Sequence, residues 1–338
     1  MATIKEIAEL AGVSRGTVDR VLNNRGMVNP DTARKVKEIA NALNYKPNKA
    51  GLILSAQKKK LKLGVILFGA NNPFFDDVIK GINEKSKELE SYNCTIKIKS
   101  IPLCIDEQIK AIDDFVNEGI NGIALTPYND KKVASKINEL YDMGIPVVTL
   151  NTDIEESKRI AYVGSNYYDS GKTAAGLMNI ITHGDVNIGI VSGSKNVMCH
   201  SERISGFKDC IENNYPHIKI LETIYNDDDD IKSYELTSRL LKNKDINALF
   251  FVAGGVYGGC GAVISLKKEH NITSISFDSV PTTKTMIEKG LIKATICQQP
   301  ELQGSKPLDI LFAYLSTGEL PKKEHIYLGL DIRIKENM

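Results

Sequence analysis

Residues 3–24 read TIKEIAELAGVSRGTVDRVLNN, and this stretch predicts two short helices joined by a tight turn. Thr3 and Glu6 have the spacing of a capping box, which starts a helix by satisfying two of its free amides. Apolar residues follow at three- and four-residue steps, namely Ile4, Ile7, Ala8, Leu10 and Ala11. Gly12 permits the left-handed turn that ends this helix, and Ser14 is a preferred cap for the next one. The segment therefore predicts a helix-turn-helix.

The second predicted helix separates its apolar from its polar side chains. Three apolar residues share the inward face, and the outward residues are Arg15, Gly16, Asp19 and Arg20. In helix-turn-helix proteins, the exposed start of the second helix enters the major groove of DNA. We therefore expect this segment to bind double-stranded DNA.

The chain carries a basic head and an acidic body. Its 338 residues have a formal net charge of +1. Residues 1–60 contain twelve Lys or Arg and five Asp or Glu, so the head carries +7 and the remaining residues −6. This division places a phosphate-binding surface at the N-terminus and argues against a body that wraps nucleic acid.

The cysteines and the N-terminal sequence indicate in which cellular compartment the protein is expected. None of the six cysteines has the Cys-x-x-Cys spacing or the histidine partners of a metal finger, so buried thiols in a reducing compartment are expected. The sequence starts without a basic-then-apolar leader, and no apolar run is long enough to span a bilayer. We therefore expect a cytoplasmic protein that does not contact a membrane.

A third predicted helix closes the head. Asn29 and Pro30 form its start, with the amide side chain as cap and proline at the first helical position. Its apolar stripe consists of Ala33, Val36, Ile39, Ala40 and Leu43. The next proline ends it, and residues 48–54 follow as a short hinge helix that is marginal unless it packs against another surface. We expect a headpiece over residues 1–46 and a hinge helix and linker over residues 47–61.

From Thr3 to Leu54 the sequence resembles the DNA-binding headpiece and hinge of the lactose repressor (LacI/GalR) family of bacterial transcription regulators. The match runs through Ala11-Gly12-Val13-Ser14, Thr17-Val18, residues 20–23 and Tyr45-x-Pro47-Asn48. The resemblance implies that Arg15, Gly16 and Arg20 face base edges. It also implies that Leu54 wedges into a central minor-groove step. The residues implied to contact phosphates are Thr3, Ser14, Thr17, Asn23, Asn29 and Thr32.

Four residues depart from the pattern of that family. Asp19 places a carboxylate near the groove, and Gly16 gives up a side chain at a base-reading position. In the hinge, Gly51 stands where the family often has alanine and Leu52 where it often has arginine. We therefore expect a head that reads fewer bases directly and depends more on phosphate contacts and the Leu54 wedge.

The body alternates predicted strands with amphipathic helices. Apolar runs typical of buried parallel strands begin at Leu63, Ile96, Gly122, Val147, Ile188, Ile218, Ala248 and Thr273. Helical patterns cover residues 76–90, 106–117, 131–143, 169–181, 202–213, 232–241 and 260–269. This order predicts an α/β fold with two doubly wound parallel sheets, because roughly 275 residues exceed one such domain. We expect an effector-binding domain over residues 62–338, with an N-lobe over about 62–161 and 299–325 and a C-lobe over about 163–297 and 327–338.

Polar and aromatic residues follow several of these strands. Parallel sheets bind ligands beyond the carboxyl ends of their strands, so two facing lobes would line one cleft with these residues. From Leu63 onward the body resembles the ribose-type periplasmic sugar-binding proteins. The resemblance is carried by Asn71-Asn72-Pro73-Phe74-Phe75, residues 144–148, Arg203-x-x-Gly206-Phe207, Phe277-Asp278 and residues 294–298.

This second resemblance implies a sugar site. The residues implied to line it are Asn72, Phe74, Phe75, Asn151, Arg203, Gly255, Asp278 and Gln298. The phenylalanines would stack on the ring, the amides and the carboxylate would bond to hydroxyls, and Arg203 would clamp ring oxygens from the second lobe. Asn151-Thr152 stands where ribose binders have an acid followed by arginine, and Gly254-Gly255 stands where they have an amide, which enlarges and neutralises that side of the cleft. We therefore expect a larger or differently substituted sugar or polyol than D-ribose.

Other patterns that could carry chemistry lack their partners. The glycine-rich run 254–261 has no following Lys-Ser/Thr and is not a P-loop. The run Asp227–Asp230 lacks the remaining ligands of a calcium loop and is expected to cap the next helix in solvent. The five histidines show no metal or triad spacing. We predict neither enzymatic activity nor a metal or cofactor.

Together these features predict an effector-responsive transcription regulator, most simply a repressor of carbohydrate genes. As a homodimer, its two heads would read a pseudo-palindromic operator. Closure of the lobes on a sugar or polyol would order or melt the hinge helix. Two alternatives stay open, namely control by a protein co-regulator that docks on the body and a free sugar-binding protein. The absence of a leader and the basic head oppose the second.

Overall fold

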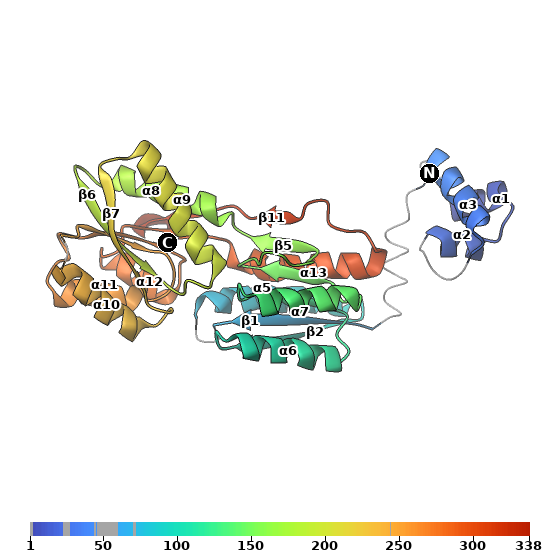
Figure 1. The fold of residues 1–338 in the computed structure, drawn as a ribbon, viewed down its shortest axis with the longest axis horizontal. Coiled ribbons are helices and arrows are strands. Elements are labelled where there is room, and N and C mark those ends of the chain that lie inside the picture. Colours follow the sequence, from blue (N-terminus) through green and yellow to red (C-terminus); the bar gives the residue numbers. More distant parts are fainter. Residues whose placement is uncertain (1–2, 23–27, 44, 46–59, 70–71, 244) are drawn as a thin grey trace. The chain divides into compact units, whose positions relative to one another are not determined.

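The computed structural model of the chain describes residues 3–22, 28–43, 45, 60–69, 72–243 and 245–338. The chain divides into two compact units (Figure 1). The first consists of residues 1–59 with residues 313–319, and the second of residues 60–312 with residues 320–338. No helix among the described residues has the length and apolar character needed to cross a membrane.

The headpiece contains α1 (Ile4–Ala11), α2 (Arg15–Leu22) and α3 (Pro30–Ala42). The predicted capping box forms, since the Thr3 amide donates to Glu6 Oε2 (2.8 Å) and the Glu6 amide donates to Thr3 Oγ1 (3.2 Å). Gly12 ends α1 in the left-handed region, with a φ of 71°. The Ser14 hydroxyl accepts from the Thr17 amide at the start of α2. Local capping therefore fixes the turn between the first two helices.

A small apolar core joins the three helices. Its buried residues are Ile7, Ala8, Ala11, Val18, Val21, Val36 and Ala40. Leu10 is not among them, because it lies beyond the edge of the face formed by Ile4, Ile7 and Ala11 and is 59% exposed. Leu43 is also on the surface, at the end of α3, with 37% of its area exposed. The prediction that these two leucines are inward-facing was wrong.

The N-lobe is built on a six-stranded sheet in the order β11-β5-β4-β3-β1-β2. Its strands are β1 (Leu61–Phe68), β2 (Cys94–Ile101), β3 (Gly122–Leu125), β4 (Val147–Leu150), β5 (Ala161–Gly164) and β11 (His325–Tyr327). Its helices are α5 (Phe74–Glu90), α6 (Ile105–Asn117), α7 (Lys131–Asp142) and α13 (Pro300–Thr317). All the strand pairs of this sheet are parallel.

The C-lobe repeats this plan in the order β12-β10-β9-β8-β6-β7. Its strands are β6 (Val186–Ser192), β7 (Ile218–Tyr225), β8 (Ala248–Phe251), β9 (Thr273–Phe277), β10 (Ala294–Cys297) and β12 (Asp331–Arg333). Its helices are α8 (Tyr167–Ile181), α9 (Met198–Asn214), α10 (Asp230–Asn243), α11 (Val256–Ser265) and α12 (Pro281–Glu288), with the short η2 (Lys335–Asn337) at the end. Only β12 runs antiparallel to its neighbour, and the predicted α/β fold with parallel sheets is confirmed.

The chain crosses between the lobes three times. The crossovers join β5 to α8, β10 to α13 and β11 to β12. β5 continues to Gly164 and β11 to Tyr327, so the first and third crossovers lie after the boundaries expected near residues 162 and 326. Each lobe is therefore discontinuous in sequence, and its sheet is completed by a strand from a distant segment.

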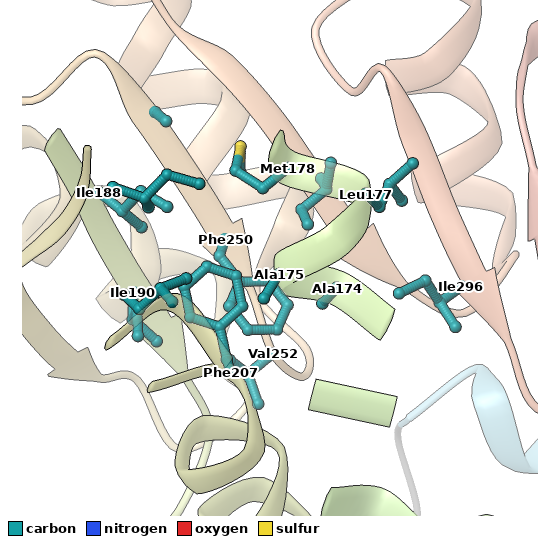
Figure 2. Close-up of a cluster of buried hydrophobic side chains, with 14 of the residues drawn as sticks. Ala174, Ala175, Leu177, Met178, Ile188, Ile190, Phe207, Phe250, Val252 and Ile296 are labelled. Carbon is teal, nitrogen blue, oxygen red and sulfur yellow. The ribbon is translucent and has the colours of Figure 1, made fainter. Parts of the chain in front are cut away.

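One apolar core of the C-lobe lies between its sheet and helices α8 and α9 (Figure 2), and a second involves α10, α11 and α12. The rings of Phe207 and Phe250 stack in the first core with centroids 4.7 Å apart. Ile188 and Ile190 from β6 lie beside this pair, and Ala174 and other small residues of α8 pack on it. Small side chains on α8 let the helix approach the sheet and α9 closely.

Candidate functional site

The described part of the head presents a polar surface around α2. Arg15, Gly16 and Arg20 are exposed, as predicted for base-reading positions. Arg20 Nε donates to the Gly16 carbonyl (3.2 Å), so the main chain at the glycine orients this guanidinium. Asn23 and Leu54 lie outside the described residues.

Three of the predicted phosphate-binding residues are helix caps. Thr3, Ser14 and Asn29 each accept a hydrogen bond from an amide in the first turn that follows them. Ser14 and Thr17 also have their hydroxyl oxygens 2.9 Å apart. Helix N-termini attract phosphate oxygens because of their free amides and positive dipole. The caps therefore keep three such termini ordered on the head.

A cavity of about 510 Å³ opens between the lobes of the body. All eight of the predicted ligand residues line it, although they come from six separate segments of the chain: Asn72, Phe74, Phe75, Asn151, Arg203, Gly255, Asp278 and Gln298. The rule that ligands bind beyond the carboxyl ends of parallel strands predicted the strand-end residues of this set, whereas Arg203 and Gly255 were implied only by the resemblance to sugar-binding proteins. That these residues bind a ligand stays a prediction.

The N-lobe contributes an apolar wall. Phe74 and Phe75 begin α5, and their rings meet edge to face with centroids 5.3 Å apart. Phe68, at the end of β1, packs on Phe75 in the same way. The Asn72 Oδ1 accepts from the Phe74 amide (3.0 Å), which leaves its amide nitrogen for a ligand. Such ring faces suit the C–H groups of a sugar.

Arg203 lies on α9 with only 2% of its area exposed. Its guanidinium carbon lies 3.8 Å from the centre of the Phe277 ring and 4.8 Å from that of Tyr167. Nη1 donates to the Val252 carbonyl (2.7 Å), whereas Nε has no partner among the described residues. A buried cationic donor without a partner is costly unless a ligand supplies an acceptor.

Asp278 follows β9 and faces this guanidinium. Burial raises the pKa of its carboxyl, and Arg203 and the hydrogen bond from Gln298 only partly oppose that effect. Gln298 Nε2 donates to both carboxylate oxygens, at 2.8 and 3.1 Å. The carboxylate is thereby held in one orientation.

Amide and phenol side chains connect the first two crossovers. Asn151 Nδ2 donates to Tyr167 Oη (3.3 Å) and to Gln303 Oε1 (3.2 Å). Tyr167 in turn donates to Gln298 Oε1 (3.0 Å). Both amide hydrogens of Asn151 are therefore engaged within the protein, and its oxygen is the atom left for a ligand.

Gly255 does not widen the cavity as expected. It starts α11 with a φ of 85°, and a Cβ at this position would lie 2.0 Å from Asn226 Nδ2. The Asn226 amide donates to the Gly254 carbonyl (3.0 Å) and fills the space beside the glycine. That side of the cleft is not neutral either, because Asp228 and His200 line it.

The run Asp227–Asp230 is thus only partly a solvent-exposed cap. Asp229 Oδ1 accepts from the Lys232 amide in the first turn of α10, as a cap does. Asp228 instead turns inward, is half-buried, and accepts from the Gly254 amide (2.7 Å). The prediction that Asp228 caps a helix in solvent was wrong. Its hydrogen-bond donor, the Gly254 amide, lies in the loop after β8, and the sequence around Asp228 contains no sign of it.

His200 is buried beside Asp228, so its charge matters for folding. Burial opposes the charged form, but Cys199 and Asp228 favour it, and the pKa of His200 rises to about 8. A raised histidine pKa stabilises the fold below the unfolded value of about 6.5, and this contribution is lost as the pH rises through 8. We expect His200→Asn to remove about 2 kcal/mol of this pH-dependent stability.

Thermal unfolding of the wild type and the variant from pH 6 to 9 measures this difference. The control is His183→Asn, which changes an exposed histidine. A wild-type curve that stays parallel to the His200→Asn curve across this range would contradict a charged, buried His200.

Direct hydrogen bonds also join the two lobes. Asn196 Nδ2 donates to Tyr128 Oη (3.1 Å), and the Asn129 amide donates to the Asn196 carbonyl (3.3 Å). The Cys199 amide donates to Thr152 Oγ1 (3.3 Å). The first two contacts form an Asn196 clasp between a loop of each lobe.

Comparison with known families agrees with this architecture. Residues 3–48 match the model of bacterial regulatory proteins of the lacI family, and residues 63–320 match that of the periplasmic binding protein domain. The chain belongs to the LacI family. Its regulatory body is of the periplasmic binding protein type, so the predicted family, fold and regulatory function are confirmed.

Full-length relatives of this LacI-family protein are transcription regulators. It is 28% identical to the "Probable HTH-type transcriptional repressor ExuR" of Bacillus subtilis, over 91% of this chain and 96% of that protein. It is 26% identical to the HTH-type transcriptional regulator MalR of Clostridium butyricum, over 97% of both chains. Among solved structures, a solute-binding protein from Burkholderia graminis in complex with D-arabinose is 25% identical, with a TM-score of 0.76 over 82% of this chain and 96% of that one.

Proposed function

We propose that this LacI-family regulator binds a pseudo-palindromic operator as a homodimer and that a sugar or polyol in the interlobe cavity controls this binding. One observation carries the proposal: a single chain joins a helix-turn-helix with exposed arginines to a cavity lined by both lobes. The relative in complex with D-arabinose supports a sugar as the class of ligand. A dimer supplies two heads for two half-sites.

The proposed roles follow the geometry of each side chain. Arg15 and Arg20 read bases from α2, and the capped helix starts hold the phosphates. In the cavity, Phe74 and Phe75 stack on the sugar, while Arg203, Asp278 and Gln298 bond to its oxygens. At DNA, we also propose that Gly16 lies against the bases, that Leu54 wedges into the minor groove, and that Thr17, Asn23 and Thr32 contact phosphates. At the sugar, the remaining lining residues proposed are Asn72, Asn151 and Gly255.

Coupling between the two sites uses the crossovers. Closure of the lobes rotates the first two crossovers, which the side chains of Asn151, Tyr167 and Gln298 connect, and the N-lobes of a dimer carry the hinges to the DNA. An effector changes operator affinity only by the difference in its affinity for the open and closed forms. The hinge and linker over residues 47–61 are proposed as the element that responds.

Selection of a random double-stranded library with the full chain tests the DNA-binding role. We expect a two-fold symmetric site, for which Arg20→Ala loses about tenfold or more in affinity, because one bidentate arginine-guanine contact contributes roughly 1–3 kcal/mol. Binding to unrelated DNA should fall much less. Lys37→Ala on α3 is the control, since it removes the same charge from an exposed position of the head.

Two outcomes would oppose the proposal. Equal losses on operator and unrelated DNA for Arg20→Ala would leave the arginine with no base-reading role. If no sugar or polyol of a panel raises the unfolding temperature, the result would oppose a sugar effector and favour a protein co-regulator.

A further inference from the structure

The two lobes line the cavity with different chemistry. The N-lobe contributes the rings of Phe74 and Phe75, whereas the C-lobe contributes the side chains of Asp228 and His200. Phe277 also lies on the C-lobe side, but the guanidinium of Arg203 covers its ring at 3.8 Å. A ligand between the lobes therefore meets the phenylalanine rings beside Asn72 and Asn151 from the N-lobe, and the charged groups beside Val197 and Val256 from the C-lobe.

Asp228 is held firmly in this position. Its backbone has a φ of 61°, in the left-handed region that non-glycine residues seldom adopt. Its amide donates to Asn226 Oδ1 (2.9 Å), and its Oδ1 accepts from the Gly254 amide (2.7 Å). Oδ2 accepts no hydrogen bond from the described residues. The loop thus holds one carboxylate oxygen in place and leaves the other for a partner.

Two glycines make room for this carboxylate. A Cβ on Gly193 would lie 2.6 Å from Asp228 Oδ1, and a Cβ on Gly254 would lie 2.9 Å from the same oxygen. Gly193 follows β6 and Gly254 follows β8, so two separate loops leave the same space free. Real Cβ atoms do not approach an oxygen this closely, and a side chain at Gly193 would displace the carboxylate.

His200 lies next to Asp228 on the same wall. Its Cε1 is also 2.6 Å from the point where a Cβ of Gly193 would be, so the imidazole and the carboxylate share one pocket corner. Nδ1 lies 3.1 Å from the Ser194 carbonyl, which can only accept, so Nδ1 carries a proton. Nε2 remains for a ligand. Asp228, Asp278, Arg203 and Cys199 are the titratable or charged groups that face the ring.

We propose that Asp228 and His200 bind a pair of hydroxyls on the face of the sugar that points away from Phe74 and Phe75. This inference rests on the proposed sugar-binding function and names its ligand class. A sugar with only equatorial hydroxyls presents C–H groups on both faces, whereas an axial hydroxyl makes one face polar and leaves the other apolar. The effector is therefore a sugar with an axial hydroxyl, stacked through its C–H face on the N-lobe phenylalanines.

Calorimetric titration of the full chain with D-galactose, D-mannose and D-glucose tests this assignment. The first two carry an axial ring hydroxyl at C4 and C2, whereas in D-glucose the hydroxyls at C2, C3 and C4 are all equatorial. We expect one of the first two to bind at least about tenfold more tightly than D-glucose, since a charge-assisted hydrogen bond contributes roughly 1.5–3 kcal/mol. D-glucose bound as tightly as both epimers would overturn the proposal.

Two variants test the residues themselves. Asp228→Asn keeps an oxygen for the Gly254 amide and loses only the free carboxylate oxygen, and His200→Asn keeps a donor for the Ser194 carbonyl. Each should weaken the preferred sugar by about tenfold to a hundredfold. The control is Asp229→Asn in the same loop, which removes the same charge, keeps the cap of α10 and should change affinity less than about threefold.

The outcomes separate this inference from the proposed function. Wild-type affinity in both test variants overturns the subsite, while the sugar-binding function stands. Equal losses in Asp228→Asn and Asp229→Asn overturn it in favour of a general attraction by the acidic loop. A wild-type chain that binds no sugar at all overturns the sugar-binding function, and this inference with it.

Discussion

Replacing Arg203 by methionine will abolish the response of operator binding to the effector while leaving operator binding itself intact. The guanidinium offers donors in a buried site between Phe277 and Tyr167. Loss of charge-assisted bonds in such a site should weaken the effector by more than about a hundredfold. Methionine is preferred to alanine because its unbranched chain fills much of the space between the two rings.

The measurement is operator affinity of the wild type and the variant across a titration of the effector. Lys208→Met on the same helix is the matched control, because Lys208 is an exposed cation paired with Glu212 at 3.8 Å. It should respond as the wild type does. An Arg203→Met protein that responds at the wild-type effector concentration would refute a clamping role for the guanidinium.

Gly171→Ala will lower the unfolding temperature of the body by about 5 °C or more. A Cβ at Gly171 would lie 2.1 Å from the Arg203 carbonyl oxygen and 2.7 Å from the Phe207 amide nitrogen. These are backbone atoms of α9, so the steric clash can be relieved only if α8 shifts against α9. Overpacking of this kind costs about 3 kcal/mol at the upper end of its usual range. That shift would also move Arg203, so we expect effector affinity to fall as well.

A second glycine on α8 provides the control. The nearest atom to a Cβ at Gly176 is Tyr215 Oη at 3.9 Å, which is an ordinary contact. Gly176→Ala should therefore raise stability slightly, because alanine is favoured over glycine in a helix by about 1 kcal/mol. Thermal unfolding of both variants checks the pair. Similar unfolding temperatures for the two would contradict close packing of α8 on α9.

Local signals in the sequence predicted the head well. The Thr3 and Glu6 capping box, the left-handed Gly12 and the Asn29 cap are formed by neighbouring residues, so the sequence pattern alone contains them. Leu10 failed because three- and four-residue steps admit residues at the edge of a helix face as well as at its centre. Its exposure is set by the position of the other two helices, which the spacing does not specify.

Local sequence patterns did not predict every helix and strand of the body. Helix α13 was not expected, because Gly304 and Pro307 lie inside it and both residues disfavour helix interiors. Gly304 is explained by tertiary packing, since its Cβ would meet the Val78 carbonyl of α5 at 2.1 Å. Strands of three residues, such as β11 and β12, are too short for a clear periodicity.

Some residues of the cavity were predicted from the sequence and others were not. Strand-end positions placed Asn72, Asn151 and Asp278 on one cavity, because the topology of parallel sheets dictates where such ends meet. The sequence did not predict Asp228 and His200 as cavity residues, because their position depends on glycines, which have no side chain, in two other loops. The glycine at 193 was the available signal, but it acquires meaning only when the loops are seen together.

The Asn196 clasp has a consequence for the unstimulated regulator. Its bonds to Tyr128 and Asn129 involve none of the residues that line the cavity, so they favour closure whether or not a sugar is bound. They therefore help to set the fraction of molecules already closed in a cell that lacks the sugar. Each 1.4 kcal/mol or so in this equilibrium changes that fraction by about tenfold while closed molecules are the minority. The background transcription of the controlled genes, and hence the dynamic range of the switch, would follow from two side chains and two backbone groups that lie outside the cavity lining.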